Sequence, residues 1–322
     1  MALIQVKDLS VSYSVFKREL KAVQGVSFDL EEQETLGIVG ESGCGKSTLG
    51  LALLNLMPPQ GKVTHGKILL DGEDILSLGK EQLRQVRGKK VAMIFQDPMT
   101  SLNPVKTIGN HFVEAIRAHD PDVSKADALE KARKIFGQLG MSPERLTDYP
   151  HQLSGGMKQR IMIGLSLALD PKLLIADEPT TALDVIIEAQ ILDLLRQLKE
   201  SLKLSMILIT HNLGVVAEVA DKIAIMYGGE IFELADTKTI FRKPLFPYTQ
   251  LLLKLVPNIA SESTSLEWIP GSPPDLSTPI VGCKFAERCP HVFAICRTVA
   301  PKLREVEPGH KVACHLYDGD RP

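Results

Sequence analysis

A glycine-rich stretch constrains the fold of this chain more than any other feature, and it reads Gly40-Glu41-Ser42-Gly43-Cys44-Gly45-Lys46-Ser47-Thr48. It follows an apolar run at 35–39 and precedes a helical pattern from about Lys46 to Met57. Because glycine has no Cβ, successive backbone N–H groups of such a loop can surround a phosphate, and the dipole of the following helix favours the same anion. The stretch therefore predicts a nucleoside triphosphate site, with Lys46 on the β- and γ-phosphates and Ser47 on Mg²⁺.

A second segment suits the same chemistry. The apolar run at 173–176 ends in two carboxylates, Asp177 and Glu178. At the carboxyl end of a buried strand, Asp177 could anchor Mg²⁺ and Glu178 could polarise the water that attacks the γ-phosphate. Such a pair could also belong to the first turn of a helix, but its occurrence together with the glycine-rich loop favours the catalytic interpretation.

Short apolar segments alternate with helical patterns through the first 235 residues, and this alternation predicts an α/β fold with a mostly parallel buried sheet. Residues 3–13 and 21–30 are expected to form antiparallel strands. The buried strands are expected at 35–39, 91–95, 173–176, 206–210 and 223–226, and the helices at 46–57, 154–169, 186–202 and 213–219. Between Pro98 and Tyr149 the pattern is helical only, with helices expected at 108–118 and 125–139, which indicates a helical insertion.

The composition is typical of a globular protein, with 44% hydrophobic and 24% charged residues among 322. A net charge of −2 does not suggest nucleic-acid binding. No apolar run approaches the length of a membrane span, and residues 1–8 do not resemble a signal peptide. We therefore expect a cytosolic protein that could serve a membrane only as a bound subunit.

The character of the chain changes near residue 236. Ten of the twenty prolines lie between Pro244 and Pro308, so residues 236–322 are expected to form an irregular appendage. Four of the five cysteines also lie there, at positions 283, 289, 296 and 314. In a reducing compartment such a group indicates a metal site more often than disulfides.

A second anion-binding loop is predicted at Ser154-Gly155-Gly156-Met157, ahead of an apolar helix. Ser154 suits the N-cap, and the two glycines expose backbone N–H groups. Since one triphosphate needs only one such loop, this one is expected to serve the nucleotide of a partner chain.

Over residues 3–235 the chain resembles the nucleotide-binding subunit of an ABC transporter, because seven motifs of that family occur in order. The loops at 40–48 and 153–157 match the Walker A and signature motifs, and the two carboxylates match Walker B. The other matches are the aromatic that stacks on adenine, the Q-loop, the D-loop and the switch histidine, at Tyr13, Gln96, Asp184 and His211. Taken singly, the tyrosine, glutamine and histidine could be ordinary core or surface residues.

The resemblance implies an ABC-type P-loop ATPase at 1–235, with a RecA-like core, an antiparallel β-subdomain and a helical subdomain at about 98–165. It implies catalytic roles for Lys46, Gln96, Glu178 and His211, with Gln96 also near Mg²⁺. Two cassettes would face each other, so that each ATP lies between the phosphate loop of one chain and the signature loop of the other. The implied partners are transmembrane permease subunits, a second identical or related ATPase and, indirectly, an extracytoplasmic solute-binding protein. The implied location is peripheral, on the cytoplasmic face of the membrane.

The appendage resembles that of dipeptide and oligopeptide permease ATPases, in the segments 246–252 and 269–274 and in its cysteines. Import of nickel or another small solute is the alternative within the family. Non-transport ABC ATPases of DNA repair or translation are a further alternative. The repair class carries a long coiled coil between its two loops, which the prolines here do not permit, and the translation class carries two cassettes in one chain.

The cysteine spacing C-x5-C-x6-C-x17-C matches neither a zinc ribbon nor a ferredoxin, so the spacing leaves the metal open between zinc and iron–sulfur. The family resemblance implies a [4Fe–4S] cluster on Cys283, Cys289, Cys296 and Cys314. The fifth cysteine, Cys44, stands at the predicted helix N-terminus, which predicts a lowered pKa and a reactive thiol.

Overall fold

The computed structural model describes residues 2–15, 18–96, 101–181, 183–256 and 269–318. The chain forms two units. The first contains Met1–Glu31, Thr35–Leu76 and Leu208–Pro322, and the second contains Glu32–Glu34 and Ser77–Ile207. Strand β8 (Ser205–Thr210) is divided between them. Among the residues described, none of the helices has both the length and the apolar character needed to cross a bilayer.

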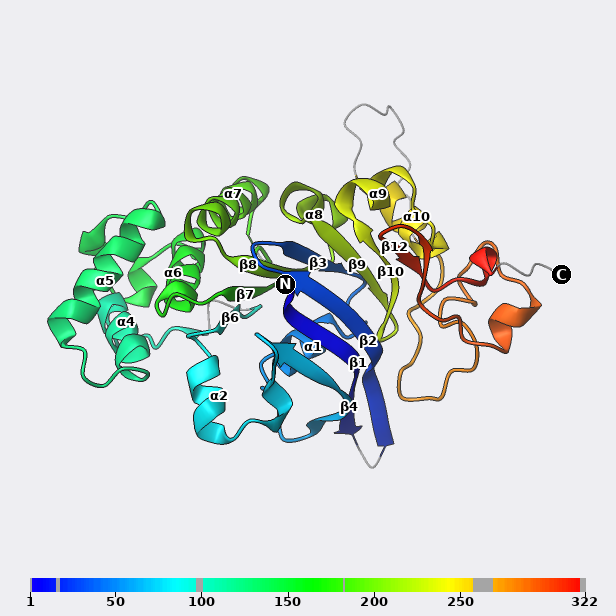
Figure 1. Cartoon of the computed structure of the whole chain (residues 1–322). Coiled ribbons are helices and arrows are strands. Elements are labelled where there is room, and N and C mark those ends of the chain that lie inside the picture. Colours follow the sequence, from blue (N-terminus) through cyan, green and yellow to red (C-terminus); the bar gives the residue numbers. More distant parts are fainter. Residues whose placement is uncertain (1, 16–17, 97–100, 182, 257–268, 319–322) are drawn as a thin grey trace. The chain divides into compact units, whose positions relative to one another are not determined.

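The first unit contains a four-stranded antiparallel sheet in the order β2-β1-β4-β5 (Figure 1). Its strands are β1 (Ala2–Val15), β2 (Arg18–Glu31), β4 (Gly61–Leu70) and β5 (Glu73–Asp74). Along β2, Val26, Phe28 and Leu30 are buried while the residues between them are exposed. This alternation is what a strand with one face on the core requires, and it confirms the two antiparallel strands predicted from the sequence.

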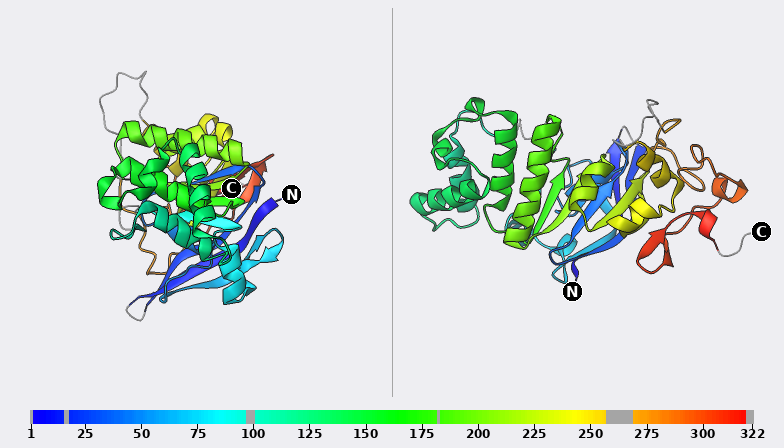
Figure 2. Two further views of the ribbon diagram at one scale, coloured as in Figure 1. Left: turned by 90° about the vertical axis from the view of Figure 1, so that its left-hand side faces the viewer. Right: turned by 90° about the horizontal axis from the view of Figure 1, so that it is seen from above.

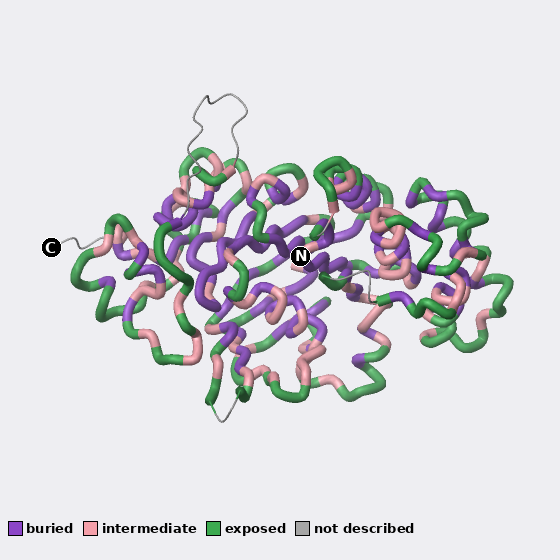
Figure 3. The backbone as a smooth tube through the Cα atoms, turned by 180° about the vertical axis from the view of Figure 1, so that it is seen from behind, coloured by how far each residue is buried: buried purple, intermediate pink, exposed green. Residues whose placement is uncertain are grey.

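A second set of strands in this unit supports the phosphate loop. It has the order β11-β12-β10-β9-β3, and β3 pairs with β9 in parallel. The strands are β3 (Thr35–Val39), β9 (Lys222–Tyr227), β10 (Glu230–Asp236), β11 (Arg304–Glu307) and β12 (His310–Val312). Every residue of β3 is buried, which suits a parallel strand. Figure 3 shows the buried parts of the chain in purple.

The α-helices described in the first unit are α1 (Lys46–Ala52), α8 (Leu213–Val219), α9 (Thr237–Arg242) and α10 (Pro247–Lys254). Helix α8 packs closely on β3, because a Cβ at Gly37 would lie only 2.1 Å from Val216 Cγ1. Helix α1 is shorter than predicted. It ends before Asn55, which has a left-handed φ of 49°, a conformation that stops a helix.

The second unit combines a parallel strand pair with helices. Strand β6 (Val91–Ile94) pairs with β7 (Leu173–Asp177). The helices are α2 (Lys80–Val86), α4 (Ile108–Arg117), α5 (Lys125–Gln138), α6 (Gly155–Leu167) and α7 (Val185–Leu202). Helices α4, α5 and α6 lie side by side (Figure 2). Their core includes Phe112 and Phe136, whose ring centroids are 5.7 Å apart. The helical insertion predicted between Pro98 and Tyr149 is confirmed for the described residues.

The prediction of an irregular appendage after residue 236 is wrong in part. Helices α9 and α10 and strands β11 and β12 lie there, and Glu233 and Leu234 of β10 pair with Val312 and Lys311 of β12. The edge of a sheet offers unpaired N–H and C=O groups, and here the C-terminal segment satisfies those of β10. Strands β4, β5 and β10 and helix α2 were not predicted from the sequence either.

Candidate nucleotide-binding site

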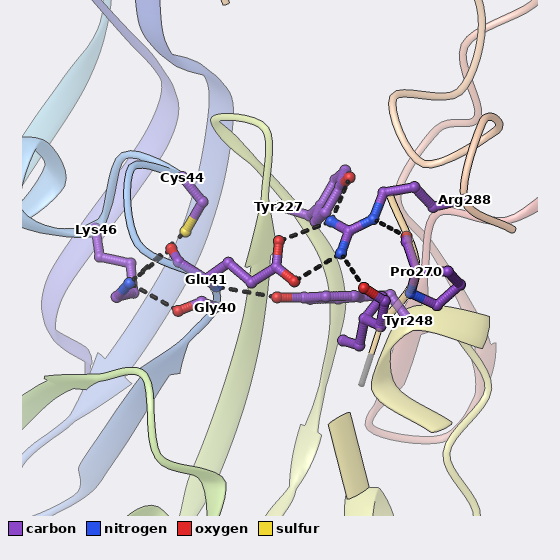
Figure 4. Close-up of polar contacts among 9 residues, drawn as sticks. Gly40, Glu41, Cys44, Lys46, Tyr227, Tyr248, Pro270 and Arg288 are labelled. Atoms are coloured by element: carbon purple, nitrogen blue, oxygen red, sulfur yellow. Dashed lines mark hydrogen bonds and ion pairs between the residues drawn. The ribbon is translucent and has the colours of Figure 1, made fainter. Parts of the chain in front are cut away.

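The glycine-rich stretch connects β3 to α1, as predicted. Lys46 is only 5% exposed, and its Nζ donates to the carbonyl oxygens of Gly40 at 2.7 Å and Glu41 at 3.0 Å (Figure 4). The loop is therefore closed around its own lysine, and a buried ammonium group is held by main-chain oxygens. These bonds fix the two ends of the loop relative to each other.

Two positions of the loop require glycine for steric reasons. A Cβ on Gly40 would lie 2.1 Å from the carbonyl oxygen of Met226, and one on Gly45 would lie 2.2 Å from that of Ala22. Gly45 also has a φ of 103°, which side-chain-bearing residues rarely adopt. The loop thus packs directly against the backbone of neighbouring strands, so that only glycine permits this path.

The prediction for Cys44 is wrong. Its side chain is buried, and burial raises the pKa of its thiol in spite of the nearby Lys46 ammonium group. The loss of hydration of a thiolate outweighs the attraction of one cation and of a seven-residue helix. We therefore expect an unreactive thiol at this position.

Tyr13 of β1 lies beside the C-terminal end of the phosphate loop. Its hydroxyl is 3.2 Å from Thr48 Oγ1, and a Cβ on Gly61 of β4 would lie 2.8 Å from its ring. The structure thus brings Tyr13 together with the loop, while its contact with an adenine base stays a prediction.

The carboxylates predicted for catalysis lie in the second unit. Asp177 ends β7 and is buried, and Glu178 follows with a left-handed φ of 45°. Glu178 Oε2 accepts hydrogen bonds from Gln96 Nε2 at 3.1 Å and from Thr181 Oγ1 at 2.9 Å. Two donors therefore orient one carboxylate oxygen. Gln96 was predicted at this site from the sequence, whereas Thr181 was not.

The predicted signature loop begins α6 in the second unit. Ser154 caps the helix, and its hydroxyl accepts from the N–H of Met157 at 3.3 Å, as predicted. Gly156 lies close to α7, since a Cβ there would be 2.9 Å from Ile187 Cγ2. Asp184 caps α7 through the N–H of Ile187 at 2.9 Å. The signature loop and the D-loop aspartate are thus neighbours, although Ala182 lies outside the described residues.

His211 follows β8 and belongs to the first unit. It is exposed and stands just before α8, whose N-cap Asn212 accepts from the N–H of Gly214 at 2.9 Å. Its predicted contact with a γ-phosphate is not tested by these contacts.

The four C-terminal cysteines, Cys283, Cys289, Cys296 and Cys314, are free thiols. Burial raises the pKa of Cys283 to about 12, and the charges of the other three cysteines add to this rise, so the four lie within electrostatic reach of one another. Among the described residues, however, no group of three or more His, Cys, Asp or Glu side chains is placed to hold a metal ion. The structure therefore does not support the predicted metal site.

A connection that the sequence analysis missed joins this segment to the phosphate loop. Arg288 forms an ion pair with Glu41, and the hydroxyl of Tyr248 accepts from the N–H of Glu41 at 2.9 Å (Figure 4). The residues are more than 200 positions apart in the chain, so no local pattern could reveal the contact.

Comparison with known proteins agrees with this description. Residues 23–181 match the family described as ABC transporter, and residues 232–296 match that described as oligopeptide/dipeptide transporter, C-terminal region. The "Probable peptide ABC transporter ATP-binding protein y4tR" of Sinorhizobium fredii is 48% identical, over 97% of this chain and 94% of that protein. The chain belongs to the ATP-binding subunits of the dipeptide/oligopeptide ABC transporter family.

Another member of the family is the "Dipeptide transport ATP-binding protein DppD" of Bacillus subtilis, 46% identical over 98% of this chain and 95% of its own length. Among solved structures, the dimeric post-hydrolysis state of the ATP-binding cassette MJ0796 bound to ADP and Pi has a TM-score of 0.65 and 26% identity, covering 73% of this chain and 98% of that one. The predicted ABC ATPase fold is confirmed by this likeness, and the chain is an ABC-type ATPase.

Proposed function

We propose that this chain is the ATP-hydrolysing subunit of an importer of dipeptides or oligopeptides. The observation that carries the proposal is the full-length likeness to dipeptide and oligopeptide transport ATP-binding proteins, at 42–48% identity over 97–99% of this chain. The match of residues 232–296 to the C-terminal region of such transporters supports it independently of the ATPase core.

We propose that the loop at 40–48 holds the triphosphate. Its support is chemical: Lys46 is a buried cation on main-chain oxygens, and the glycines let backbone N–H groups approach an anion. On ATP binding, Lys46 would exchange these carbonyl oxygens for phosphate oxygens. Ser47 and Asp177, with Gln96, would hold Mg²⁺, which neutralises charge on the phosphates.

Glu178 is proposed as the group that polarises the attacking water. Hydrogen bonds from Gln96 and Thr181 orient its carboxylate, and a carboxylate held in one orientation suits a general base. His211 would contact the γ-phosphate, and Tyr13 would stack on the adenine.

The signature loop is proposed to act on the nucleotide of a second ATPase chain, identical or related. Ser154 and the N-terminal N–H groups of α6, a helix of thirteen residues, form an anion site of the usual kind. The dimeric structures of MJ0796, one of them with ADP and Pi, support a paired arrangement for this family. Asp184, next to the signature loop, would belong to the same interface.

We also propose roles for the two domains of the chain and a location for the protein in the cell. The ATPase function would belong to residues 1–235, with a helical subdomain at about 98–165, and residues 236–322 would form the extension typical of peptide transporters. Permease subunits would hold the chain at the cytoplasmic face of the membrane, and a solute-binding protein would act through them.

The four C-terminal cysteines are proposed to bind a [4Fe–4S] cluster, with zinc as the alternative. The proposal rests on the family resemblance. In the structure Cys296 is buried, the other three cysteines are half-buried, and the four lie within electrostatic reach of one another. Bound metal would keep the thiols deprotonated and would cross-link the extension. Iron and sulfide analysis of protein purified without oxygen tests this: about four irons per chain is the expected result, and stoichiometric zinc or no metal contradicts it.

The transport proposal is tested in cells that lack this chain. Uptake of a labelled dipeptide should return with the wild-type chain but not with Lys46→Ala, which should also lose ATP binding. Restored uptake of Ni²⁺ in place of peptide, or ATPase activity without any effect on uptake, would contradict the peptide assignment.

A further inference from the structure

We propose that Arg288 is a positioning residue for ATP binding, which reaches from the cysteine-containing segment to Glu41 and holds the phosphate loop in shape. The inference rests on the proposed function in one respect, since it takes the loop at 40–48 to be the triphosphate site. It goes further by giving the C-terminal extension a direct part in nucleotide binding.

The guanidinium group of Arg288 uses all five of its N–H donors. Two parallel bonds reach the carboxylate of Glu41, from Nη1 at 2.7 Å and from Nη2 at 2.9 Å. Nη1 also bonds the hydroxyl of Tyr227 at 3.1 Å, and Nη2 and Nε bond the carbonyl oxygens of Ile269 at 3.2 Å and Pro270 at 2.8 Å. A guanidinium group with all its donors bonded can adopt only one orientation, so it holds the Glu41 carboxylate in one position.

The pair is shielded from solvent. The side chain of Arg288 is 5% exposed and that of Glu41 is 23% exposed. A charge-assisted bond in such surroundings is stronger than a surface ion pair, and the loss of one partner leaves an uncompensated charge. The contact is therefore more than a solvated bridge between two mobile side chains.

Glu41 transmits this constraint to the phosphate loop through its backbone. Its carbonyl oxygen accepts from Lys46 Nζ at 3.0 Å and from the N–H of Cys44 at 3.3 Å, while its N–H donates to the Tyr248 hydroxyl at 2.9 Å. Arg288 thus fixes the side chain of the residue whose main chain orients the phosphate-binding lysine (Figure 4). A displacement of Glu41 moves Lys46 and the loop together.

The C-terminal side of the contact is rigid. Five packed rings form an aromatic cluster in the first unit, and its members are Tyr227, Phe232, Phe246, Tyr248 and Phe285. Phe285, which is fully buried, fixes the turn that carries Arg288, because the N–H of Arg288 donates to its carbonyl oxygen at 3.0 Å. The turn that carries Arg288 is therefore anchored on packed aromatic rings. Arg288 directly precedes Cys289 in the sequence.

Charge balance gives Arg288 a second effect on the loop. Glu41 places a carboxylate in the loop that is proposed to bind a triphosphate. The negative charges of the carboxylate and the phosphates repel each other. The guanidinium group compensates this carboxylate through its two bonds to Glu41. Its removal both loosens the loop and leaves a negative charge there, and both changes weaken ATP binding.

The test is the affinity for ATP of the full-length protein, measured by titration with a fluorescent ATP analogue, together with steady-state ATPase kinetics. In Arg288→Gln, we expect the dissociation constant and the KM for ATP to rise about 10- to 100-fold. The kcat at saturating ATP should change by less than about threefold, because Arg288 acts through Glu41 and is not one of the residues proposed for catalysis. Arg297→Gln, at an exposed site of the same segment, is the control and should stay within about twofold.

Conservative variants separate positioning from simple folding. Arg288→Lys keeps the charge but loses the second bond to Glu41, so it should bind ATP with intermediate affinity and show faster amide hydrogen exchange at residues 41–45. The double variant Glu41→Gln with Arg288→Gln should recover part of the affinity lost in Arg288→Gln, because no uncompensated carboxylate is left.

ATP affinity within about twofold of wild type in Arg288→Lys, with unchanged exchange at residues 41–45, would overturn the proposal even if Arg288→Gln fails to fold. Retained ATP binding by Lys46→Ala would instead refute the assignment of the triphosphate site. The two failures are thus distinguishable.

Discussion

The bond between the Tyr248 hydroxyl and the N–H of Glu41 allows a sharp test of how the extension supports the phosphate loop. Tyr248 is fully buried, and its ring packs against those of Tyr227 and Phe285. The change Tyr248→Phe keeps this ring and removes one oxygen atom. It leaves the N–H of Glu41 without the acceptor that lies 2.9 Å away.

The expected cost follows from this geometry. The change removes no ring atoms from the cluster, so the cavity contribution is small. The main loss is a part-buried donor without its partner, which costs about 1 kcal/mol, the lower end of the range for such a donor. Because burial raises the pKa of Tyr248, the hydroxyl is protonated at neutral and mildly alkaline pH. The loss in the free energy of unfolding should therefore be equal at pH 7 and pH 9.

Urea unfolding followed by circular dichroism measures the effect, and native-state hydrogen exchange at the amide of Glu41 locates it. Tyr149→Phe is the matched control, since Tyr149 is 40% exposed and lies in the other unit, and it should change stability by less than about 0.5 kcal/mol. If Tyr248→Phe costs no more than Tyr149→Phe and the exchange of the Glu41 amide is unchanged, the reasoning is refuted.

Three further predictions concern the proposed site. Glu178→Gln should lower kcat for ATP hydrolysis by about 10²- to 10⁴-fold with ATP affinity nearly retained, and a loss of less than tenfold in single-turnover assays would exclude Glu178 as the base. Tyr13→Ala should weaken ATP binding by about 1–3 kcal/mol with kcat largely kept, whereas Tyr13→Phe should bind almost normally; equal affinities of all three proteins would rule out stacking. Because burial raises the pKa of the Cys44 thiol, less thiolate is present at a given pH than in the unfolded chain, so iodoacetamide should label Cys44 more slowly at pH 8 than in urea. Peptide mass spectrometry measures this, and equal rates would contradict it.

The sequence determined those features that depend on residues close together in the chain. The glycine-rich loop, the strand that ends in Asp177 and the cap at Ser154 are local, because each rests on backbone conformation, hydropathy or hydrogen bonds within a few residues. The sites of the buried strands and of most long helices follow in the same way, as do the motifs that identify the family.

Tertiary packing alone decided the pKa of Cys44, the strand pairing of the C-terminal segment and the contact between Arg288 and Glu41. Cys44 stands at a helix N-terminus, which by itself favours a thiolate, but burial against the strands has the opposite and larger effect. The proline-rich C-terminal segment gives little local signal for β11 and β12, whose pairing is set by the open edge of β10. The bond from Arg288 to Glu41 joins residues 247 positions apart in the chain, and only the folded structure brings their charges together, because no pattern among neighbouring residues encodes a contact over that separation.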